Sequence, residues 1–319
     1  MTRRFVLQEF HHVSVLLEKT VQAVMQDPAG IYVDCTLGGA GHAKYLADQL
    51  SAQGRFIGID QDPAALAAGR EKLSGVPCQV DLIHSNFSRL GDVLAELGVE
   101  KVNGIVFDLG VSSHQLDVAE RGFSYQQDAP LDMRMNPQQA RSAYDVVNTY
   151  EEEELARIIK EFGEERWAKR IASFVATARQ TAPIETTGQL VDIIKRAIPA
   201  AARRDGPHPA KRTFQAIRIE VNQELEILQG AFRTAIEHLL PGGRLAIITF
   251  HSLEDRAAKQ ALAAAAKGCI CPPKLPICMC GHQPQVRLLG KAVTPSEQEL
   301  ENNPRARSAK LRIAEKLGR

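Results

Sequence analysis

The chain has 319 residues, of which 44% are hydrophobic and 24% are charged, and its formal net charge is +1. This composition is typical of a folded globular protein, and the length suggests two domains, or one domain with a large insertion. No apolar run is long enough to cross a membrane, and residues 1–4 are not followed by the apolar core of a signal peptide. We therefore expect a cytoplasmic protein that does not act at a membrane.

The N-terminal part alternates strands with helices. Strands are expected at 31–35, 55–59, 80–84 and 104–107. Helices are expected at 11–25, 42–50 and 63–73, with a helical stretch that ends at 97. Strands that alternate with helices form a parallel sheet, because a parallel neighbour is reached only through a crossover. The sequence thus predicts an α/β fold whose ligand lies at the carboxyl ends of the strands.

A helical block then interrupts the alternation. It comprises helices expected at 151–162, 167–182 and 187–200. One long helix at 212–240 and a strand at 244–250 lead back to the sheet, followed by a helix at 252–266 and a weaker antiparallel pair at 285–289 and 311–314. A helical block between two strands of one sheet indicates an inserted domain. We assign 1–137 and 206–319 to the sheet domain, and 138–205 to an all-helical insertion.

A glycine-rich loop at 38–41 follows the first strand, and its backbone N–H groups face the next helix. Asp60 ends the second strand, where a carboxylate accepts hydrogen bonds from both hydroxyls of a ribose. A dinucleotide site needs a further glycine at position 44, which is occupied by Lys44. The pattern therefore favours S-adenosylmethionine, which has no pyrophosphate. Phe87, after the third strand, is the expected stacking partner of the adenine.

The residues that end the fourth strand face the substrate in methyltransferases of this architecture. The lone pair of an exocyclic base amine is delocalised into the ring, so an acceptor that holds the N–H hydrogens makes it available. Asp108 and the carbonyl of Leu109 or Gly110 are the candidates for this acceptor. Attack on a ring carbon would need a cysteine at this position, and there is none. Phe123 and Tyr125 are candidates for stacking on a flipped-out base.

Eight ordered motifs make the chain resemble the bacterial ribosomal small-subunit methyltransferases that modify cytosine N4 in 16S ribosomal RNA. The motifs are GGAGH at 38–42, DLGVSSHQ at 108–115, ERGFS at 120–124, PLDMRM at 130–135, GEER at 163–166, RTFQAIR at 212–218, FHSLEDR at 250–256 and NPRARS at 303–308. They span nearly the whole chain.

The resemblance implies a Rossmann-like S-adenosylmethionine-dependent methyltransferase sheet with a helical substrate-recognition insertion. The implied substrate is a cytidine in the decoding region of 16S rRNA, within the assembled small subunit, and a homodimer is left open. The cofactor contacts expected from the loop and the resemblance are Gly39, Ala40, Gly41, His42, Asp60, Phe87, Asp108 and Gln115.

His251 and Ser252 follow the last parallel strand at the same sheet edge as Asp108. They are interpreted as contacts to the target base or its phosphate, with the alternative that Ser252 only caps the next helix. Basic residues outside the pocket are candidates for contacts with RNA phosphates: Lys211, Arg212, Arg218, Arg305 and Arg307. The C-terminal pair fits a solvated helix face equally well.

Four cysteines lie close together near the C-terminus, at Cys269, Cys271, Cys278 and Cys280. Their soft sulfur ligands suit zinc, but the spacing is not that of the usual Cys-x-x-Cys knuckle, so the metal is left open. A zinc ion here would be structural, because methyl transfer needs no metal.

Two functions from other classes remain open on the sequence. A nucleotide-dependent oxidoreductase is disfavoured by Lys44. A non-catalytic ribosome-assembly factor would use the fold only to bind rRNA, and would bind S-adenosylmethionine weakly or not at all.

Overall fold

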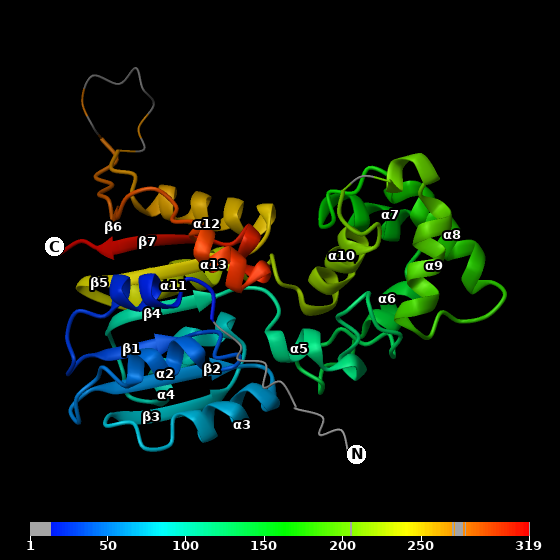
Figure 1. The fold of residues 1–319 in the computed structure, drawn as a ribbon. Coiled ribbons are helices and arrows are strands. Elements are labelled where there is room, and N and C mark those ends of the chain that lie inside the picture. The colour runs from blue at the N-terminus through cyan, green and yellow to red at the C-terminus, as the bar shows by residue number, and fades with distance from the viewer. Residues whose placement is uncertain (1–13, 205, 270, 272–276, 278, 319) are drawn as a thin grey trace, which may run out of the picture.

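A computed structural model describes residues 14–204, 206–269, 271, 277 and 279–318 (Figure 1). Cys278 and the start of the helix expected from residue 11 lie outside these residues. The described chain forms one seven-stranded sheet with the strand order β3-β2-β1-β4-β5-β7-β6. The strands are β1 (Ile31–Asp34), β2 (Arg55–Asp60), β3 (Gln79–His84), β4 (Val102–Asp108), β5 (Leu239–Thr249), β6 (Val286–Leu288) and β7 (Lys310–Lys316).

The first five strands are parallel, and β7 runs antiparallel between β5 and β6. The fold is therefore the Rossmann-like α/β sheet that the sequence predicts, and the C-terminal antiparallel pair is confirmed.

Helices cover both faces of the sheet (Figure 1). Alternate residues of each strand point to opposite faces, so Ile57 packs with α4, α11 and α12, whereas its neighbour Phe56 packs with α1, α2 and α3. On one face lie α4 (Leu90–Glu96), α11 (Leu228–His238) and α12 (Ser252–Ala265); on the other lie α1 (Leu17–Val24), α2 (Gly41–Ala47) and α3 (Pro63–Lys72). Helices α5 (Ser113–Asp117) and α13 (Glu297–Asn302) lie toward the carboxyl ends of the parallel strands (Figure 1).

The helical block forms a separate body beside the sheet (Figure 1). It comprises α6 (Ala143–Thr149), α7 (Glu152–Glu161), α8 (Ala168–Arg179), α9 (Thr187–Ala197) and α10 (Lys211–Asn222). Its own hydrophobic cluster runs from Phe123 to Val221, so residues on both sides of 138–205 contribute to its core. The proposed domain boundaries stay a prediction.

Two local predictions are wrong. The long helix expected at 212–240 is broken, because Gln223 has a left-handed backbone (φ 51°) that ends α10 before α11 begins at Leu228. The N-cap of α12 is His251 rather than Ser252, and it forms a capping box with Glu254. The short helices α5, α6 and α13 were not predicted.

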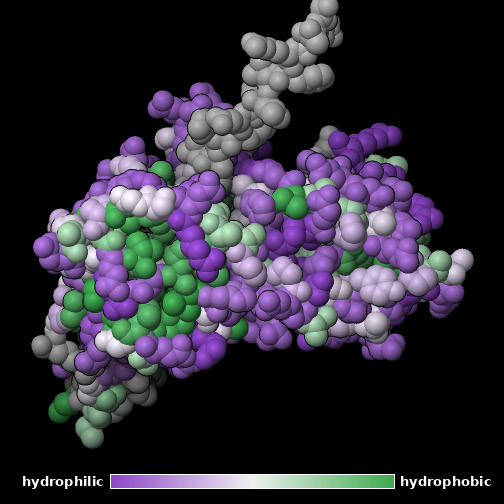
Figure 2. Space-filling view, turned by 90° about the horizontal axis from the view of Figure 1, so that it is seen from below, coloured by the Kyte–Doolittle hydropathy of each residue, from purple (hydrophilic) through white to green (hydrophobic). Residues whose placement is uncertain are grey.

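Seen from below, the sheet part presents an apolar area framed by hydrophilic residues, whereas the helical body is mainly hydrophilic (Figure 2). Within the part of the chain that the structure describes, no helix is both long and apolar enough to span a bilayer.

Candidate functional site

A cavity of about 570 Å³ opens at the carboxyl ends of the parallel strands. Residues at the ends of β1, β2, β4 and β5 line one side of it: Cys35, Asp60, Asp108 and Phe250. The other side comes from the helical body, through residues 123–127 and α10. This volume suits a ligand of the size of a cofactor, and the position is where open parallel sheets bind their ligands.

The glycine loop between β1 and α2 approaches the cavity closely. Gly38 and Ala40 both have left-handed backbones, with φ of 49° and 55°. At Gly41 a Cβ atom would lie 1.8 Å from Ser14 Oγ, so this position has no space for a side chain. The tight loop lets backbone groups rather than side chains form this part of the wall.

Asp60 is held by two backbone N–H groups. Gly38 N–H donates to Oδ2 and Asp62 N–H donates to Oδ1, both at 2.8 Å. Each carboxylate oxygen keeps a further lone pair that can accept from a ligand hydroxyl. Burial raises the pKa of Asp60 to about 6, and burial likewise raises the pKa of the neighbouring Asp34 to about 6.

Asp108 contacts His42 across the cavity floor. His42 Nδ1 lies 3.4 Å from Asp108 Oδ2, and His42 Nε2 lies 3.0 Å from the carbonyl oxygen of Val15. Both ring nitrogens thus face acceptors. Burial by itself would lower the pKa of His42, but the hydrogen bond and charge of Asp108 raise it above the ordinary value. His42 is therefore biased toward its cationic form.

The second carboxylate oxygen of Asp108 is buried and has no hydrogen-bond donor among the described residues. The backbone N–H of Asp108 donates to Thr36 Oγ1 at 2.6 Å, which fixes the end of β4 against β1. A buried acceptor without a donor is unusual and costs free energy. The Asp108 side chain as a whole is 27% exposed and lines the cavity, so its accessible part can accept a hydrogen bond from a ligand.

The adenine side of the predicted pocket contains Phe87. Its ring lines the cavity and packs edge-on against Phe107, with the ring centroids 5.6 Å apart. Beside it, Asn86 Nδ2 donates to Gln61 Oε1 at 2.9 Å. The ring is thereby held in place before any ligand arrives.

Comparison with known proteins agrees with this geometry. Residues 9–317 match the family described as the MraW methylase family. The chain belongs to this family. A relative from Clostridioides difficile (strain 630), named "Ribosomal RNA small subunit methyltransferase H", is 56% identical over 97% of this chain and 100% of its own length. A relative of the same name from Heliobacterium modesticaldum is 55% identical over 97% and 99% of the two chains.

A solved structure described as an rRNA methylase from Streptococcus thermophilus covers 94% of this chain and 93% of its own, with 12% identity and a TM-score of 0.42. That likeness is too weak to add to the family assignment.

The residues predicted to bind the cofactor come together around the cavity. All of them line it except Ala40, which is fully buried in the loop behind it. Gln115 lies there too, but its amide is engaged: Oε1 accepts from Ser112 N–H, and Nε2 donates to Asp62 Oδ2 at 2.9 Å. Its role as a direct contact stays a prediction.

Sequence reasoning missed Asp62 and Arg121. Asp62 is 2% exposed, caps α3, and accepts from both Gln115 and Arg121 Nη1, the latter at 2.7 Å. Arg121 also donates to the carbonyl oxygens of Arg134 and Met135. These contacts tie α3 to the entrance of the helical body. The Asp62-Pro63 pair, a typical helix start, is the signal that could have identified the cap.

The two aromatic candidates differ in their surroundings. Phe123 lines the cavity but is only 6% exposed, because it belongs to the core of the helical body. Tyr125 stacks on His208, with 4.6 Å between centroids and 8° between planes, and meets Phe214 edge-on. One face of Tyr125 is thus occupied within the chain. Stacking of either ring on a base stays a prediction.

His251 and Ser252 also differ. His251 lines the cavity, and its Nε2 lies 3.0 Å from Glu254 Oε1, although the two atoms are not aligned for a hydrogen bond. Ser252 is outside the cavity lining and donates to Glu164 Oε2 at 2.5 Å. His251 is therefore the better placed of the two to contact a substrate.

Three of the candidate RNA contacts, Lys211, Arg218 and Arg305, line the cavity, whereas Arg212 and Arg307 do not. Lys211 lines the cavity and is exposed, and Arg212 is exposed beside it. Arg218 is partly buried, with its guanidinium held by both oxygens of Glu224 at 2.8 and 2.9 Å. Arg305 pairs with Asp117 at the cavity rim, and Arg307 is exposed. Lys211 and Arg212 are therefore the most accessible of the set near the cavity.

Proposed function

We propose that this protein transfers a methyl group from S-adenosylmethionine to the N4 amine of a cytidine in the decoding region of 16S ribosomal RNA. The family and the curated relatives support an rRNA methyltransferase. The observation that carries the choice of an amine as the acceptor is the position of Asp108, a partly exposed carboxylate that ends β4 and lines the cavity.

The cavity fits the cofactor on its chemistry. Asp60 offers acceptors for two ribose hydroxyls, and Phe87 offers a ring held in place for the adenine. The acidic side chains around the loop, Asp34 and Asp108 among them, suit a ligand with positive charges. When bound, S-adenosylmethionine supplies a methyl group on a positively charged sulfur.

Asp108 is the residue that would orient the amine. Its carboxylate would accept an N4 hydrogen, which makes the nitrogen lone pair available for the methyl group. As the bond from nitrogen to carbon forms and the bond from sulfur to that carbon breaks, the carboxylate would take up the proton that the nitrogen loses. His42 lies beside Oδ2, which fixes the direction of the carboxylate. Positioning of this kind supplies most of the rate in a direct transfer, and no covalent bond to the protein is needed.

Attack on a ring carbon is the chemical alternative, and it needs a thiolate. Cys35 lines the cavity, but burial raises the pKa of its thiol well above the ordinary value. A neutral, buried thiol is a poor nucleophile. The cavity therefore favours transfer to an exocyclic amine.

The wall from the helical body would receive the RNA. Tyr125 is the candidate that stacks on the target base, and His251, which also lines the cavity, is a further contact. Lys211 and Arg212 would meet phosphates. We further propose that the substrate is the assembled small subunit in the cytoplasm. We propose a pair of identical chains as the working form, which light scattering during gel filtration would test.

The function is tested by incubating the protein with labelled S-adenosylmethionine and small subunits that lack the modification, followed by nucleoside mass spectrometry. We expect label in N4-methylcytidine. Methylation of cytosine C5 or of a ribose would refute the proposed target atom. Cofactor binding without any transfer would refute the substrate, and absence of cofactor binding would favour a non-catalytic assembly factor.

A matched variant separates the role of the stacking ring. Tyr125→Phe keeps the ring and should keep turnover, whereas Tyr125→Ala should lower it by about tenfold or more, since stacking of a base on an aromatic ring contributes about 1–3 kcal/mol. Equal turnover of the two variants would remove Tyr125 from the proposal.

A further inference from the structure

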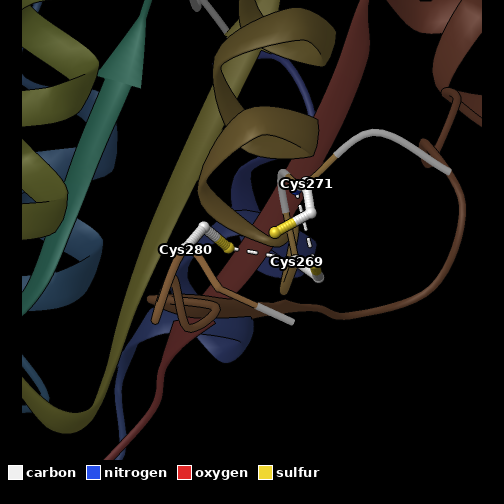
Figure 3. A group of neighbouring side chains, drawn as sticks. All are labelled: Cys269, Cys271 and Cys280. Atoms are coloured by element: carbon white, nitrogen blue, oxygen red, sulfur yellow. Dashed lines mark hydrogen bonds between the residues drawn. The ribbon is translucent and has the colours of Figure 1, made fainter. Parts of the chain in front are cut away.

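Three cysteine sulfurs converge in the loop that joins α12 to β6. The sulfurs of Cys269, Cys271 and Cys280 all lie within 4.8 Å of one another (Figure 3). Sγ of Cys269 and Sγ of Cys280 are 3.8 Å apart. Residues up to eleven positions apart in the sequence thus bring their sulfur atoms together.

The sulfur spacing is that of a metal site. Zinc binds thiolates at about 2.3 Å in tetrahedral geometry, so two sulfurs on one zinc ion lie about 3.8 Å apart. Two sulfurs in a disulfide are only about 2.05 Å apart. The separation between Cys269 and Cys280 fits the first arrangement and not the second.

Backbone N–H groups point at each of the three sulfurs. Cys271 N–H donates to Cys269 Sγ at 3.4 Å, Met279 N–H to Cys271 Sγ at 3.3 Å, and His282 N–H to Cys280 Sγ at 3.5 Å. Hydrogen bonds to sulfur favour the thiolate over the thiol, and such bonds also orient sulfur ligands around a metal. The loop backbone therefore directs an N–H donor at each of the three sulfurs, an arrangement that also orients sulfur ligands around a metal.

We propose that Cys269, Cys271 and Cys280 bind one zinc ion. Three soft sulfur ligands select zinc over hard cations such as magnesium or calcium. The fourth position of the tetrahedron lies beyond these three sulfurs. Cys278 is outside the residues that the structure describes, and the three sulfurs by themselves define the site.

The ion has a structural role, because the site is far from the chemistry. The N-cap of α12 is at the cavity, and the helix then runs for 14 residues, about 21 Å, before the loop begins. At the far end the loop is joined to the fold by His282 Nδ1 with the carbonyl of Gly268 at 2.7 Å, and by Gln285 N–H donating to Ala265 O. Zinc would close the loop between these anchors, where Met279 is 81% exposed and supplies no core.

A second group with metal-ligand atoms, Glu224, His251 and Glu254, does not compete for this role. Arg218 already binds both oxygens of Glu224. A guanidinium at that place supplies the positive charge that a cation would bring.

The test is the metal content of protein expressed in zinc-containing medium and purified with a reductant and without a chelator. We expect about one zinc ion per chain in the wild type, and less than about a tenth of that in the Cys269→Ser/Cys280→Ser variant. Cys78→Ala is the matched control, because Cys78 is buried just before β3, the opposite edge strand, and its loss should leave the zinc content unchanged.

A measurement on the wild type alone guards against a variant that fails to fold. When the zinc is removed with a chelator and cobalt is added, thiolate ligands should give intense sulfur-to-cobalt charge-transfer absorption. In a second measurement, trypsin should cut after Lys267 more slowly in the metal-bound protein than in the chelated protein. Wild-type protein with reduced thiols, no zinc and no cobalt absorption would overturn the proposal. A Cys269–Cys280 disulfide in freshly purified, metal-free protein would overturn it as well.

Discussion

The two walls of the cavity have opposite character. The sheet wall carries Asp60 and Asp108, which end β2 and β4, and the buried Asp34 ends β1 outside the cavity lining. The wall from the helical body carries Lys211 and the stacked ring of Tyr125. Acidic groups suit a small cationic cofactor, whereas cationic and aromatic groups suit a polyanion with bases.

This difference predicts which substitutions should affect the cofactor or the transfer step and which should affect RNA binding. Atoms of the sheet wall are fixed by strand register, so their loss should affect the cofactor or the transfer step. Groups of the other wall lie on a helix start and a loop, and their loss should weaken RNA binding and leave cofactor binding unchanged.

The largest effect is expected at Asp108, where the two ligands meet. Asp108→Asn replaces one acceptor oxygen with a donor, so the amine is no longer held and kcat should fall by about 10²-fold or more. Single-turnover transfer to subunits lacking the modification measures this loss. Near-normal turnover would remove the orienting role from Asp108.

Asp60→Ala should act on the cofactor alone. Loss of hydrogen bonds to a charged group weakens binding by about 1.5–3 kcal/mol, which is about 10- to 100-fold in Kd. Calorimetric titration with S-adenosylmethionine measures the change. Asp81→Ala is the control, because Asp81 pairs with Arg55 outside the cavity. Equal losses in both variants would point to general destabilisation.

Lowering the pH should change the stability of the free protein and its affinity for the cofactor in opposite directions. The pKa values of Asp34 and Asp60 are raised from 3.8 to about 6 in the folded protein. Between these values the folded state binds more protons than the unfolded state, so the stability of the free protein should fall as pH rises toward 6. Cofactor affinity should change in the opposite direction, since the ionised carboxylate of Asp60 is the stronger acceptor for the ribose hydroxyls.

Titrations between pH 5 and 8 check this opposition. We expect the affinity for the cofactor to drop by up to about tenfold per pH unit below 6 for each carboxylate that must ionise. Asp60→Asn should flatten part of this dependence. An affinity that is constant down to pH 5 would contradict the role of both carboxylates.

On the opposite wall, Lys211→Ala/Arg212→Ala should weaken RNA binding and its salt dependence. Each lost phosphate contact lowers the slope of log K against log salt concentration by about 0.7–0.9. Cofactor affinity should stay unchanged. Lys169→Ala, an exposed lysine on α8 outside the cavity lining, is the control. Unchanged RNA affinity in the double variant would remove the pair from the interface.

The smallest effect is expected for Ser252→Ala. The variant loses one hydrogen bond to Glu164, between the start of α12 and the helical body, which contributes about 1 kcal/mol to stability. The melting temperature should fall, whereas turnover should change little, because Ser252 does not line the cavity. A loss of turnover as large as that of Asp108→Asn would make Ser252 a substrate contact.

The sheet could be predicted from sequence because its signal is local. Each parallel strand is a short apolar run, and the polar residue at its end, such as Asp60 or Asp108, must reach the common edge. The identity of the cofactor followed from the same ends, with Lys44 excluding a dinucleotide.

What could not be predicted depends on contacts between distant segments. The break at Gln223 lies within a sequence that is helical on both sides, and nothing local marks its left-handed backbone. The burial of Phe123 and the pairing of Arg218 with Glu224 depend on how the helical body packs. Similarly, His251 became the helix cap in place of Ser252, because the orientation of the first turn decides which side chain reaches Glu254 N–H.

The pairing of β4 with β5 has a consequence for folding. Asp108 and Ile248 are neighbours in the sheet, yet the whole helical body lies between them along the chain. Closing so long a loop from a disordered chain is entropically unfavourable, and the penalty grows with the logarithm of loop length. A helical body that folds first brings its two ends together and shortens that search. The segment that we propose to face the RNA would therefore also set the speed at which the cofactor pocket forms.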